Sequence, residues 1–584
     1  MYIEKIKSPK DVKAIAIDKL PILAEEVRSA LLTRVSNHGG HVGPNLGIVE
    51  TTIAMHYVFN APADKFVFDV SHQSYPHKLL TGRAFGFLNP DEYDKISGYS
   101  SPSESPEYDT FELGHTSTSI ALATGLQKAR DIKGGKENIV VVIGDGSLSG
   151  GEAFEGMNEA TELGTNFILI VNDNEMSIAE NHGGMYKNLK SLRESNGKAE
   201  CNLFKAMGFD YIYQGNANNI SDMIETFKKV KDIDHPIVIH IHTEKGHGFA
   251  PAIKDKERWH WSMPFDLETG ESKVSFDGED YSSITYDFLQ KEMKKDPTIV
   301  AVTSATPTIA GFYPAQRKAA GKQHIDVGIA EEEAVAMISG MAKGGIHPVY
   351  NVYSTFLQRT YDQLAQDLCI NKNPAVINVF AASIYGMNDL THIGFYDIPM
   401  IGNIPNLVYL APTCCEEYLA MEQWAITQNE HPVAIRVPAA VVHSKAKFDT
   451  DYNQLDRYEI TQKGNKIAIV ALGGFFQLGE AVVNRLKKEC NIEATLINPR
   501  YITGLDTNLM EKLKIDHQLV VSLEDGVLEG GFGEKIARFF GPSSVKTLCF
   551  GIKKGIYDRY VVDELIKENH LTVEQIVDDI NKVL

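Results

Sequence analysis

Short, continuous apolar runs recur along the whole chain, and segments of helix length separate them. In the first third these runs are KFVFDV, NIVVVIG, NFILIVND and PIVIHIHT. Continuous apolar runs are typical of strands buried on both faces, and consecutive parallel strands require a crossover that is usually a helix. The alternation therefore predicts an α/β fold with largely parallel sheets.

Two polar stretches interrupt this pattern, at 266–283 and 445–466, and we interpret them as connections between domains. The chain has 584 residues, which is the length of several domains. We predict three of them, at 1–270, 284–442 and 460–584.

Composition narrows the classes of function. The formal net charge of −20 argues against non-specific binding to nucleic acid or to an anionic membrane. No apolar run is long enough to cross a bilayer, and the N-terminal sequence MYIEKIKSPKD lacks the apolar core of a signal peptide. The six cysteines include no CxxC pair. We therefore expect a cytoplasmic protein whose partners are small molecules rather than nucleic acid or membrane.

Two strand ends carry polar residues. Asp145, in a Gly-Asp-Gly turn, follows NIVVVI, and Asn174, in Asn-Asp-Asn, follows FILIV. Neighbouring parallel strands end at the same sheet edge, where ligands bind. A carboxylate, an amide oxygen and a nearby carbonyl suit Mg²⁺, and the helix expected at 150–163 can direct N–H groups at phosphate. The pattern predicts a metal–diphosphate site, although an ordinary βαβ unit with a glycine-rich turn stays open.

The spacing of these two turns matches the thiamine diphosphate motif. The segment GDGSLSGGEAFEGMNEA…NDNEMSIAEN resembles transketolase-like enzymes, and specifically the 1-deoxy-D-xylulose-5-phosphate synthase family. GGHVGPNLGIVE, GHTSTSIALATG, DVGIAEEEAVAMISGMAKGG and EDGVLEGGFG extend this resemblance along nearly the whole chain. It implies α/β architecture with three doubly wound domains of the transketolase type (diphosphate-binding, pyrimidine-binding and C-terminal), and a homodimer.

The resemblance also implies an activity. Thiamine diphosphate and Mg²⁺ would support decarboxylation of pyruvate and transfer of the two-carbon unit to D-glyceraldehyde 3-phosphate, giving 1-deoxy-D-xylulose 5-phosphate. Three alternatives stay open: ketol transfer of the transketolase kind, a related carboligation with another donor or acceptor, and a non-catalytic paralogue. The pathway is also open between isoprenoid, vitamin and sugar metabolism.

Site residues carry over from the family motifs. The implied metal ligands are Asp145, Asn174 and the carbonyl of Met176. The implied cofactor-binding residues are His72, Gly114, His115, Thr116, Gly146, Ser147, Asn174, Lys245, Phe249, Glu331 and Phe356. The implied catalytic residues are Glu331, His41 and His392, and the implied substrate-binding residues are Tyr353, Arg359, Asn388 and Arg436.

Glu331 has a specific chemical task in this scheme. A carboxyl group bonded to the aminopyrimidine ring favours the imino tautomer that removes the thiazolium proton. We expect Glu332 and Glu333 to be solvated residues at a helix start. His41 and His392 suit proton transfer at a developing alkoxide, because imidazole titrates near neutral pH.

The chain departs from the family pattern near the expected acceptor pocket. Phe380 and Ala381 replace an Asp-Arg pair, Asn388 replaces an Asp, Glu333 replaces a His and Phe249 replaces a Tyr. Loss of the Arg removes a charge-assisted contact worth about 1.5–3 kcal/mol. We therefore expect intact cofactor machinery and altered acceptor recognition.

Overall fold

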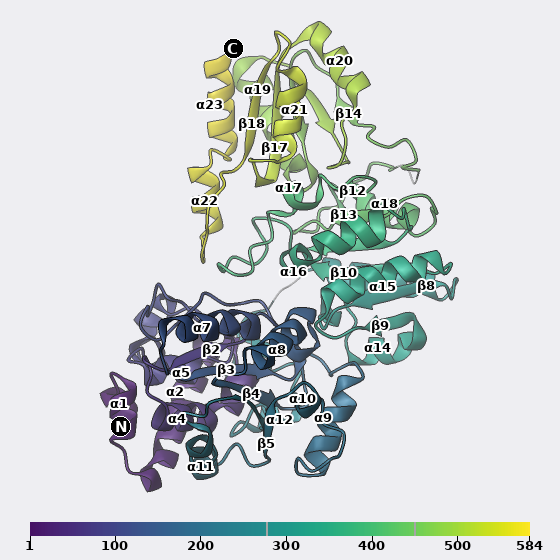
Figure 1. Ribbon diagram of the computed structural model, residues 1–584. Coiled ribbons are helices and arrows are strands. Elements are labelled where there is room, and N and C mark those ends of the chain that lie inside the picture. The colour runs from purple at the N-terminus through teal and green to yellow at the C-terminus, as the bar shows by residue number, and fades with distance from the viewer. Residues whose placement is uncertain (276–277, 449–450) are drawn as a thin grey trace. The chain divides into compact units, whose positions relative to one another are not determined.

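The computed structural model describes residues 1–275, 278–448 and 451–584, in two compact units (Figure 1). The first unit comprises Met1–Asp277 with Gly328–Ala330, and the second comprises Gly278–Val327 with Glu331–Leu584. The connections expected at 266–283 and 445–466 each include two residues, 276–277 and 449–450, that lie outside the described residues. The three-domain division stays a prediction.

The first unit is built on a five-stranded parallel sheet in the order β2-β3-β4-β6-β5. Its strands are β2 (Lys65–Phe68), β3 (Ile139–Gly144), β4 (Phe167–Asp173), β5 (Asp210–Gln214) and β6 (Pro236–His242). The four apolar runs predicted as strands are confirmed as β2, β3, β4 and β6. β5 was not predicted, because this edge strand is only partly buried and has no continuous apolar run.

Helices cover both faces of this sheet, and Figure 1 shows α7 and α8 on one side and α4 and α11 on the other. Alternate residues of β3 enter two different cores: Val140 and Val142 pack in one, Val141 and Ile143 in the other. This explains why the strand is apolar at every position. The helices of this unit are α1 (Pro9–Lys13), α2 (Leu20–His38), α3 (Gly43–Gly47), α4 (Val49–Val58), α5 (Tyr75–Leu80), α6 (Phe85–Leu88), α7 (Ser119–Lys133), α8 (Gly151–Leu163), α9 (Met185–Glu194), α10 (Leu203–Ala206), α11 (Ile220–Val230) and α12 (Ala250–Lys254).

α2 ends at Gly39, which has a φ of +85° that a glycine adopts readily. α8 occupies the place expected after the Gly-Asp-Gly turn. A two-stranded antiparallel ribbon, β1 (Gly40–His41) with β7 (Trp261–Ser262), then places His41 opposite Trp261.

The second unit contains two sheets. The six-stranded sheet is parallel, in the order β12-β13-β11-β10-β8-β9, and the five-stranded sheet has the order β14-β16-β15-β17-β18. The strands are β8 (Ile299–Thr303), β9 (His324–Asp326), β10 (His347–Tyr353), β11 (Val376–Phe380), β12 (Val408–Leu410), β13 (Val433–Arg436), β14 (Glu459–Gln462), β15 (Lys466–Ala471), β16 (Thr495–Asn498), β17 (His517–Val527) and β18 (Lys546–Ile552). The longer helices are α13 (Tyr281–Met293), α15 (Glu331–Lys343), α18 (Cys415–Ala425), α19 (Phe476–Cys490), α20 (Thr507–Asp516), α21 (Phe532–Phe540) and α23 (Val573–Val583).

β14 lies inside the stretch 445–466 that we interpreted as a connection. It pairs antiparallel with β16 at the edge of the sheet, and most of its residues are exposed, so its composition does not distinguish it from a loop. Among the described residues, no helix combines the length and the apolar composition needed to cross a membrane.

Candidate active site

The carboxyl ends of four adjacent strands in the first unit carry polar residues. Asp69 and His72 follow β2, Asp145 follows β3, Asn174 follows β4 and Lys245 follows β6. Because β2, β3, β4 and β6 are neighbours in a parallel sheet, these residues lie along one edge. This edge is where α/β sheets bind ligands.

Asp145 is the most unusual carboxylate at this edge. Its side chain is buried, Oδ2 accepts a 2.6 Å hydrogen bond from Asn181 Nδ2, and Oδ1 has no hydrogen-bond partner among the described residues. Burial, and then repulsion by Asp173, raises the pKa of Asp145 to about 8. A buried carboxylate oxygen without a donor is stabilised by a cation, so this residue fits the predicted role of Mg²⁺ ligand.

Asn174 and Met176 form a tight turn directly after β4. Met176 N–H donates to Asn174 Oδ1 at 3.2 Å. The main-chain N–H of Asn174 faces the Asp145 carboxylate and lowers the pKa of Asp145. The structure therefore brings Asp145 and Asn174 together on neighbouring strand ends. Within the described residues, no group of three or more His, Cys, Asp or Glu side chains is arranged to hold a metal ion. The predicted ligand set differs from such a group, because it combines one carboxylate with an amide and a main-chain carbonyl.

A buried ion-pair network supports the turn after β4. Asp173 Oδ2 accepts hydrogen bonds from His240 Nε2 at 2.8 Å and from Arg193 Nη1 at 2.5 Å. Burial alone would raise the pKa of Asp173, but these hydrogen bonds hold it below its ordinary value. No role was predicted for these three residues, because they come from three segments whose contact no local motif reveals.

The loop that contains Gly114, His115 and Thr116 is fixed beside the Gly-Asp-Gly turn. Asp69 accepts hydrogen bonds from the N–H groups of Ser117 at 2.9 Å and Ser119 at 3.2 Å. Ser117 Oγ in turn donates to the carbonyl of Ser147 at 2.8 Å. The predicted cofactor residues before Ser117 and those around Ser147 therefore share one edge of the first unit.

Histidine rings gather at the same edge. The His41 ring centre lies 5.1 Å from that of His72 and 5.6 Å from that of His260. Lys245 donates from Nζ to the carbonyl of Ser177 at 2.7 Å, and burial lowers its pKa to about 7. Burial, followed by repulsion from Lys245, lowers the pKa of His260 well below its ordinary value. Sequence reasoning missed His260, whose only local signal is a His between two Trp residues.

Phe249, which the family motifs imply as a cofactor-binding residue, lies in an aromatic cluster of the first unit. Its ring is buried and packs against Trp259 and Phe265, at centroid distances of 5.1 and 6.1 Å. The phenyl group belongs to the hydrophobic core of the first unit, and its role in cofactor binding stays a prediction.

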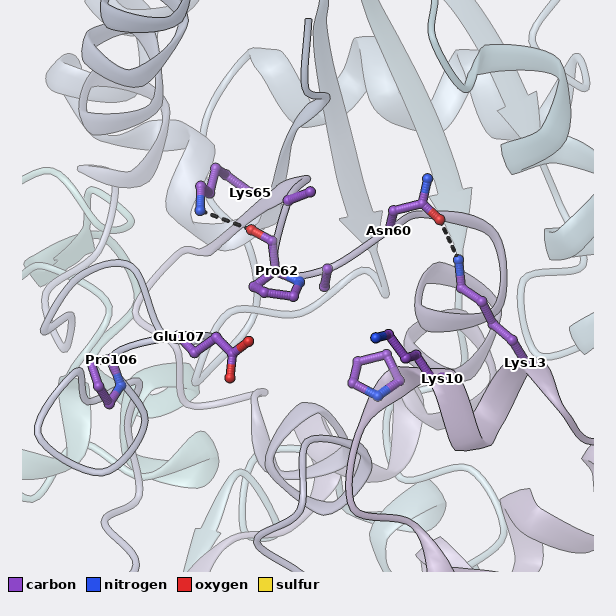
Figure 2. A pocket seen from close by; sticks show the side chains of 10 residues that line it. Lys10, Lys13, Asn60, Pro62, Lys65, Pro106 and Glu107 are labelled. Atoms are coloured by element: carbon purple, nitrogen blue, oxygen red, sulfur yellow. Dashed lines mark hydrogen bonds between the residues drawn. The ribbon is translucent and has the colours of Figure 1, made fainter. Parts of the chain in front are cut away.

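A hollow of about 570 Å³ lies elsewhere on the first unit (Figure 2). Lys10, Lys13, Lys65 and Glu107 line it, together with proline and alanine residues. Lys65 begins β2, so this hollow is at the amino end of that strand, whereas the predicted site residues follow the carboxyl ends. None of the predicted site residues lines it.

In the second unit, Glu331 is the first residue of α15. Its side chain is 3% exposed, and burial raises its pKa to about 7. Oε2 lies 3.5 Å from Arg359 Nη1 and accepts no hydrogen bond from the described residues. Glu332 is half-buried and Glu333 is exposed, which agrees with their expected place at a helix start.

The predicted residues Tyr353, Phe356 and His392 lie together. The Phe356 ring centre is 5.7 Å from the rings of both Tyr353 and His392. His392 Nδ1 lies 3.0 Å from Asp389 Oδ1. Burial would raise the pKa of Asp389, but the hydrogen bond and charge of His392 together with the hydrogen bonds from Thr391 outweigh burial and lower this pKa. An orienting carboxylate is therefore present one residue after Asn388, which sequence reasoning missed by comparing position 388 alone.

Asn388 itself contacts a distant loop of the second unit. Its Nδ2 donates to the carbonyl of Tyr560 at 3.0 Å, and its own carbonyl accepts from the N–H of Arg559 at 2.6 Å. These contacts give Asn388 a structural role in holding the 388–392 loop. Its predicted role in substrate binding stays a prediction.

Arg436 is placed differently from its predicted role as a substrate-binding residue. Its buried guanidinium donates to Asp397 Oδ2 at 2.8 Å and also pairs with Asp525. Both carboxylates come from distant parts of the chain, so no local motif indicated these contacts. These bonds use the N–H donors of the Arg436 guanidinium, which argues against binding of a substrate phosphate by the same group.

We expect Asp389 to set the orientation of His392. Asp389→Asn keeps the shape of the side chain but removes the charge that favours the bonded imidazole orientation, and should lower kcat/KM by about 10-fold. Asp516→Asn, which removes the same kind of carboxylate–imidazole contact at His517 (2.6 Å), is the matched control and should have a smaller effect. Steady-state kinetics of both variants test this, and an equal loss in the two would contradict it.

Three stretches of the chain match models of known protein families. Residues 278–443 match the family model of the transketolase pyrimidine-binding domain, and residues 456–576 match that of the transketolase C-terminal domain. The chain therefore has the α/β fold of the transketolase class, as predicted. Residues 3–202 match the 1-deoxy-D-xylulose-5-phosphate synthase model.

Full-length relatives are more specific. The chain is similar to 1-deoxy-D-xylulose-5-phosphate synthases from Clostridium tetani (35% identity, covering 100% of this chain and 99% of the relative) and Halothermothrix orenii (36%, covering 96% and 93%). A synthase from Alkaliphilus oremlandii is 35% identical over 100% of this chain and 99% of its own length. The chain belongs to the 1-deoxy-D-xylulose-5-phosphate synthase family, which confirms the resemblance identified from its motifs.

Proposed function

We propose that this enzyme decarboxylates pyruvate and joins the two-carbon unit to D-glyceraldehyde 3-phosphate, giving 1-deoxy-D-xylulose 5-phosphate. The observation that carries the proposal is the Asp145 carboxylate, buried beside Asn174 at adjacent strand ends with one oxygen lacking a donor. Family membership favours this reaction over ketol transfer and over a non-catalytic role. We further propose a cytoplasmic homodimer.

The residues present fit thiamine diphosphate with Mg²⁺. Asp145, Asn174 and the Met176 carbonyl would hold the metal ion. The diphosphate would bind near Gly146, Ser147, Gly114, His115 and Thr116, with His72 and Lys245 beside them. When bound, this coenzyme supplies a carbanion that adds to the donor carbonyl and then accepts the electrons released by decarboxylation.

The chain's own residues then hold and move protons. Glu331 keeps its proton up to about pH 7 and would hydrogen-bond the aminopyrimidine ring, against which Phe356 would stack. His41 and His392 would exchange protons with the donor and acceptor oxygens. Tyr353 would line the acceptor pocket, and Arg359 would orient Glu331.

The residues expected to recognise the phosphate of the acceptor differ from the family pattern. Ala381 provides no cation, and Arg436 is held by two carboxylates. We therefore propose that the enzyme discriminates less strongly between phosphorylated and free aldehydes than an arginine at position 381 would allow.

Ala381→Arg should raise the kcat/KM ratio of D-glyceraldehyde 3-phosphate to D-glyceraldehyde by about 10-fold or more, because a charged hydrogen bond contributes about 1.5–3 kcal/mol. Ala381 has a φ of +53°, and alanine already carries a Cβ there, so arginine adds no new backbone clash. Ala381→Gln, which has a long side chain without charge, is the control. An unchanged ratio in the arginine variant, or an equal rise in both, would contradict the proposal.

Labelled pyruvate tests the reaction itself. With thiamine diphosphate, Mg²⁺ and ¹⁴C-carboxyl pyruvate, we expect release of ¹⁴CO₂ and formation of 1-deoxy-D-xylulose 5-phosphate when D-glyceraldehyde 3-phosphate is added. Product from xylulose 5-phosphate as donor, without CO₂ release from pyruvate, would instead indicate ketol transfer.

A further inference from the structure

Asn45 joins the two histidine-bearing segments of the first unit. This residue lies in α3, and its side chain is 1% exposed. Its Nδ2 donates to the carbonyl of His41 at 2.9 Å and to the carbonyl of His72 at 2.7 Å. One amide group therefore ties together main-chain positions that are far apart in sequence.

The third bond of Asn45 fixes which way the amide faces. Its Oδ1 accepts a 2.9 Å hydrogen bond from the N–H of Tyr75. Since both carbonyls require a donor and the Tyr75 N–H requires an acceptor, only one orientation of the amide satisfies all three groups. Tyr75 also reaches His41 from the other side, because the N–H of His41 donates to the Tyr75 hydroxyl at 3.4 Å.

No other side chain of this size replaces these bonds. Aspartate has the same shape but places an oxygen against two carbonyl oxygens, and alanine leaves both carbonyls without their donor. The backbone on either side of the His41 and His72 rings, whose centres are 5.1 Å apart, is thus set by Asn45.

We infer that Asn45 is a positioning residue that sets the distance and facing of the His41 and His72 imidazoles. This inference rests on the proposed function, in which His41 exchanges protons with the substrate and His72 lines the coenzyme. A displacement of about 1 Å at reacting groups can lower a rate by about 100-fold.

The chain offers a closely matched control. Asn166 is also buried, donates from Nδ2 to Asn138 Oδ1 at 3.0 Å and to the Ile233 carbonyl at 2.7 Å, and accepts from the Ile139 N–H at 3.1 Å. It immediately precedes β4, at the amino end of the strand. Asn45→Ala and Asn166→Ala therefore remove the same kinds of bond at opposite edges of the sheet.

The test compares kcat, KM for pyruvate, thermal midpoint and histidine-ring NMR signals in both variants and in Asn45→Asp. We expect similar losses of thermal stability in the two alanine variants. Only the Asn45 variants should lose kcat, by about 10- to 100-fold, with a smaller change in KM. Only they should shift the His41 and His72 ring signals of the coenzyme-free protein, assigned with His41→Gln and His72→Gln.

Asn45 variants with wild-type kcat and unmoved ring signals would overturn the inference, as would an equal loss of kcat in Asn166→Ala. If Asn45→Ala does not fold, Asn45→Asp carries the same comparison. A wild-type protein that forms no product refutes the proposed function instead, and the ring signals of the coenzyme-free variants still decide whether Asn45 positions the two histidines.

Discussion

Glu331→Gln is expected to lower product formation by about 10²- to 10⁴-fold, the range for loss of a positioned acid or base. The amide keeps the shape of the carboxyl group and can still hydrogen-bond, but it cannot share a proton with the aminopyrimidine ring. Steady-state kinetics with saturating coenzyme and Mg²⁺ measure this loss.

The same substitution should stabilise the coenzyme-free protein at alkaline pH. The pKa of Glu331 is raised from an ordinary 4.5 to about 7, so the folded state binds this proton more tightly than the unfolded chain. Below pH 4.5 the Glu331 carboxyl is protonated in both the folded and the unfolded state, so folding buries a neutral group. As pH rises from 4.5 to 7 the wild-type free energy of unfolding falls, by roughly 3 kcal/mol in total, and glutamine avoids this loss.

Glu333→Gln is the matched control, because Glu333 is two residues away on the same helix start and is exposed. It should change neither product formation nor the pH dependence of unfolding. Chemical denaturation of both variants at pH 5 and pH 8 measures the stability effect. A Glu331→Gln enzyme with wild-type activity would remove the catalytic assignment, whereas a variant that is inactive but gains no stability at pH 8 would refute only the burial argument.

Asp145→Asn is expected to weaken divalent-cation binding by about 100-fold, since it removes the only carboxylate of the proposed ligand set. Binding of Mn²⁺, followed by electron paramagnetic resonance in the presence of thiamine diphosphate, reports this without any turnover. Product formation should fall in parallel and recover in part at high Mg²⁺ concentration, because the amide oxygen remains a weak ligand.

Asp64→Asn provides the control for Asp145. Asp64 is also buried and accepts from the N–H of Asn138 at 2.8 Å, but it lies at the start of β2 rather than beyond the carboxyl end of a strand. This variant should lose stability while keeping the wild-type affinity for Mn²⁺. Equal Mn²⁺ affinity in the wild-type and Asp145→Asn proteins would show that the metal ion binds elsewhere.

The strands that are buried on both faces could be predicted from the sequence. β3 and β4 are apolar at nearly every position because both faces are covered, and the turns that follow them place Asp145 and Asn174 where the pattern predicted. β5 and β14 escaped prediction because edge strands are partly exposed and read like loops.

Site residues that belong to one continuous motif could be predicted from the sequence. Contacts between segments that are distant in the sequence could not. Asp389 and His392 are three residues apart, yet the family comparison looked for a carboxylate at 388. Arg436 looked available because its partners, Asp397 and Asp525, are 39 and 89 residues away. The contacts of Asn45 with His41 and His72 were likewise invisible, since only the folded chain places one amide between the two carbonyls.

Calorimetric titration of thiamine diphosphate into the wild-type protein, with and without Mg²⁺, tests most directly the claim that this chain holds the coenzyme through a metal ion at the carboxyl edge of the first sheet. We predict saturable heat with one coenzyme per chain when Mg²⁺ is present and much weaker binding after chelation. Absence of binding heat in the presence of Mg²⁺, or binding of equal strength in its absence, would contradict the account.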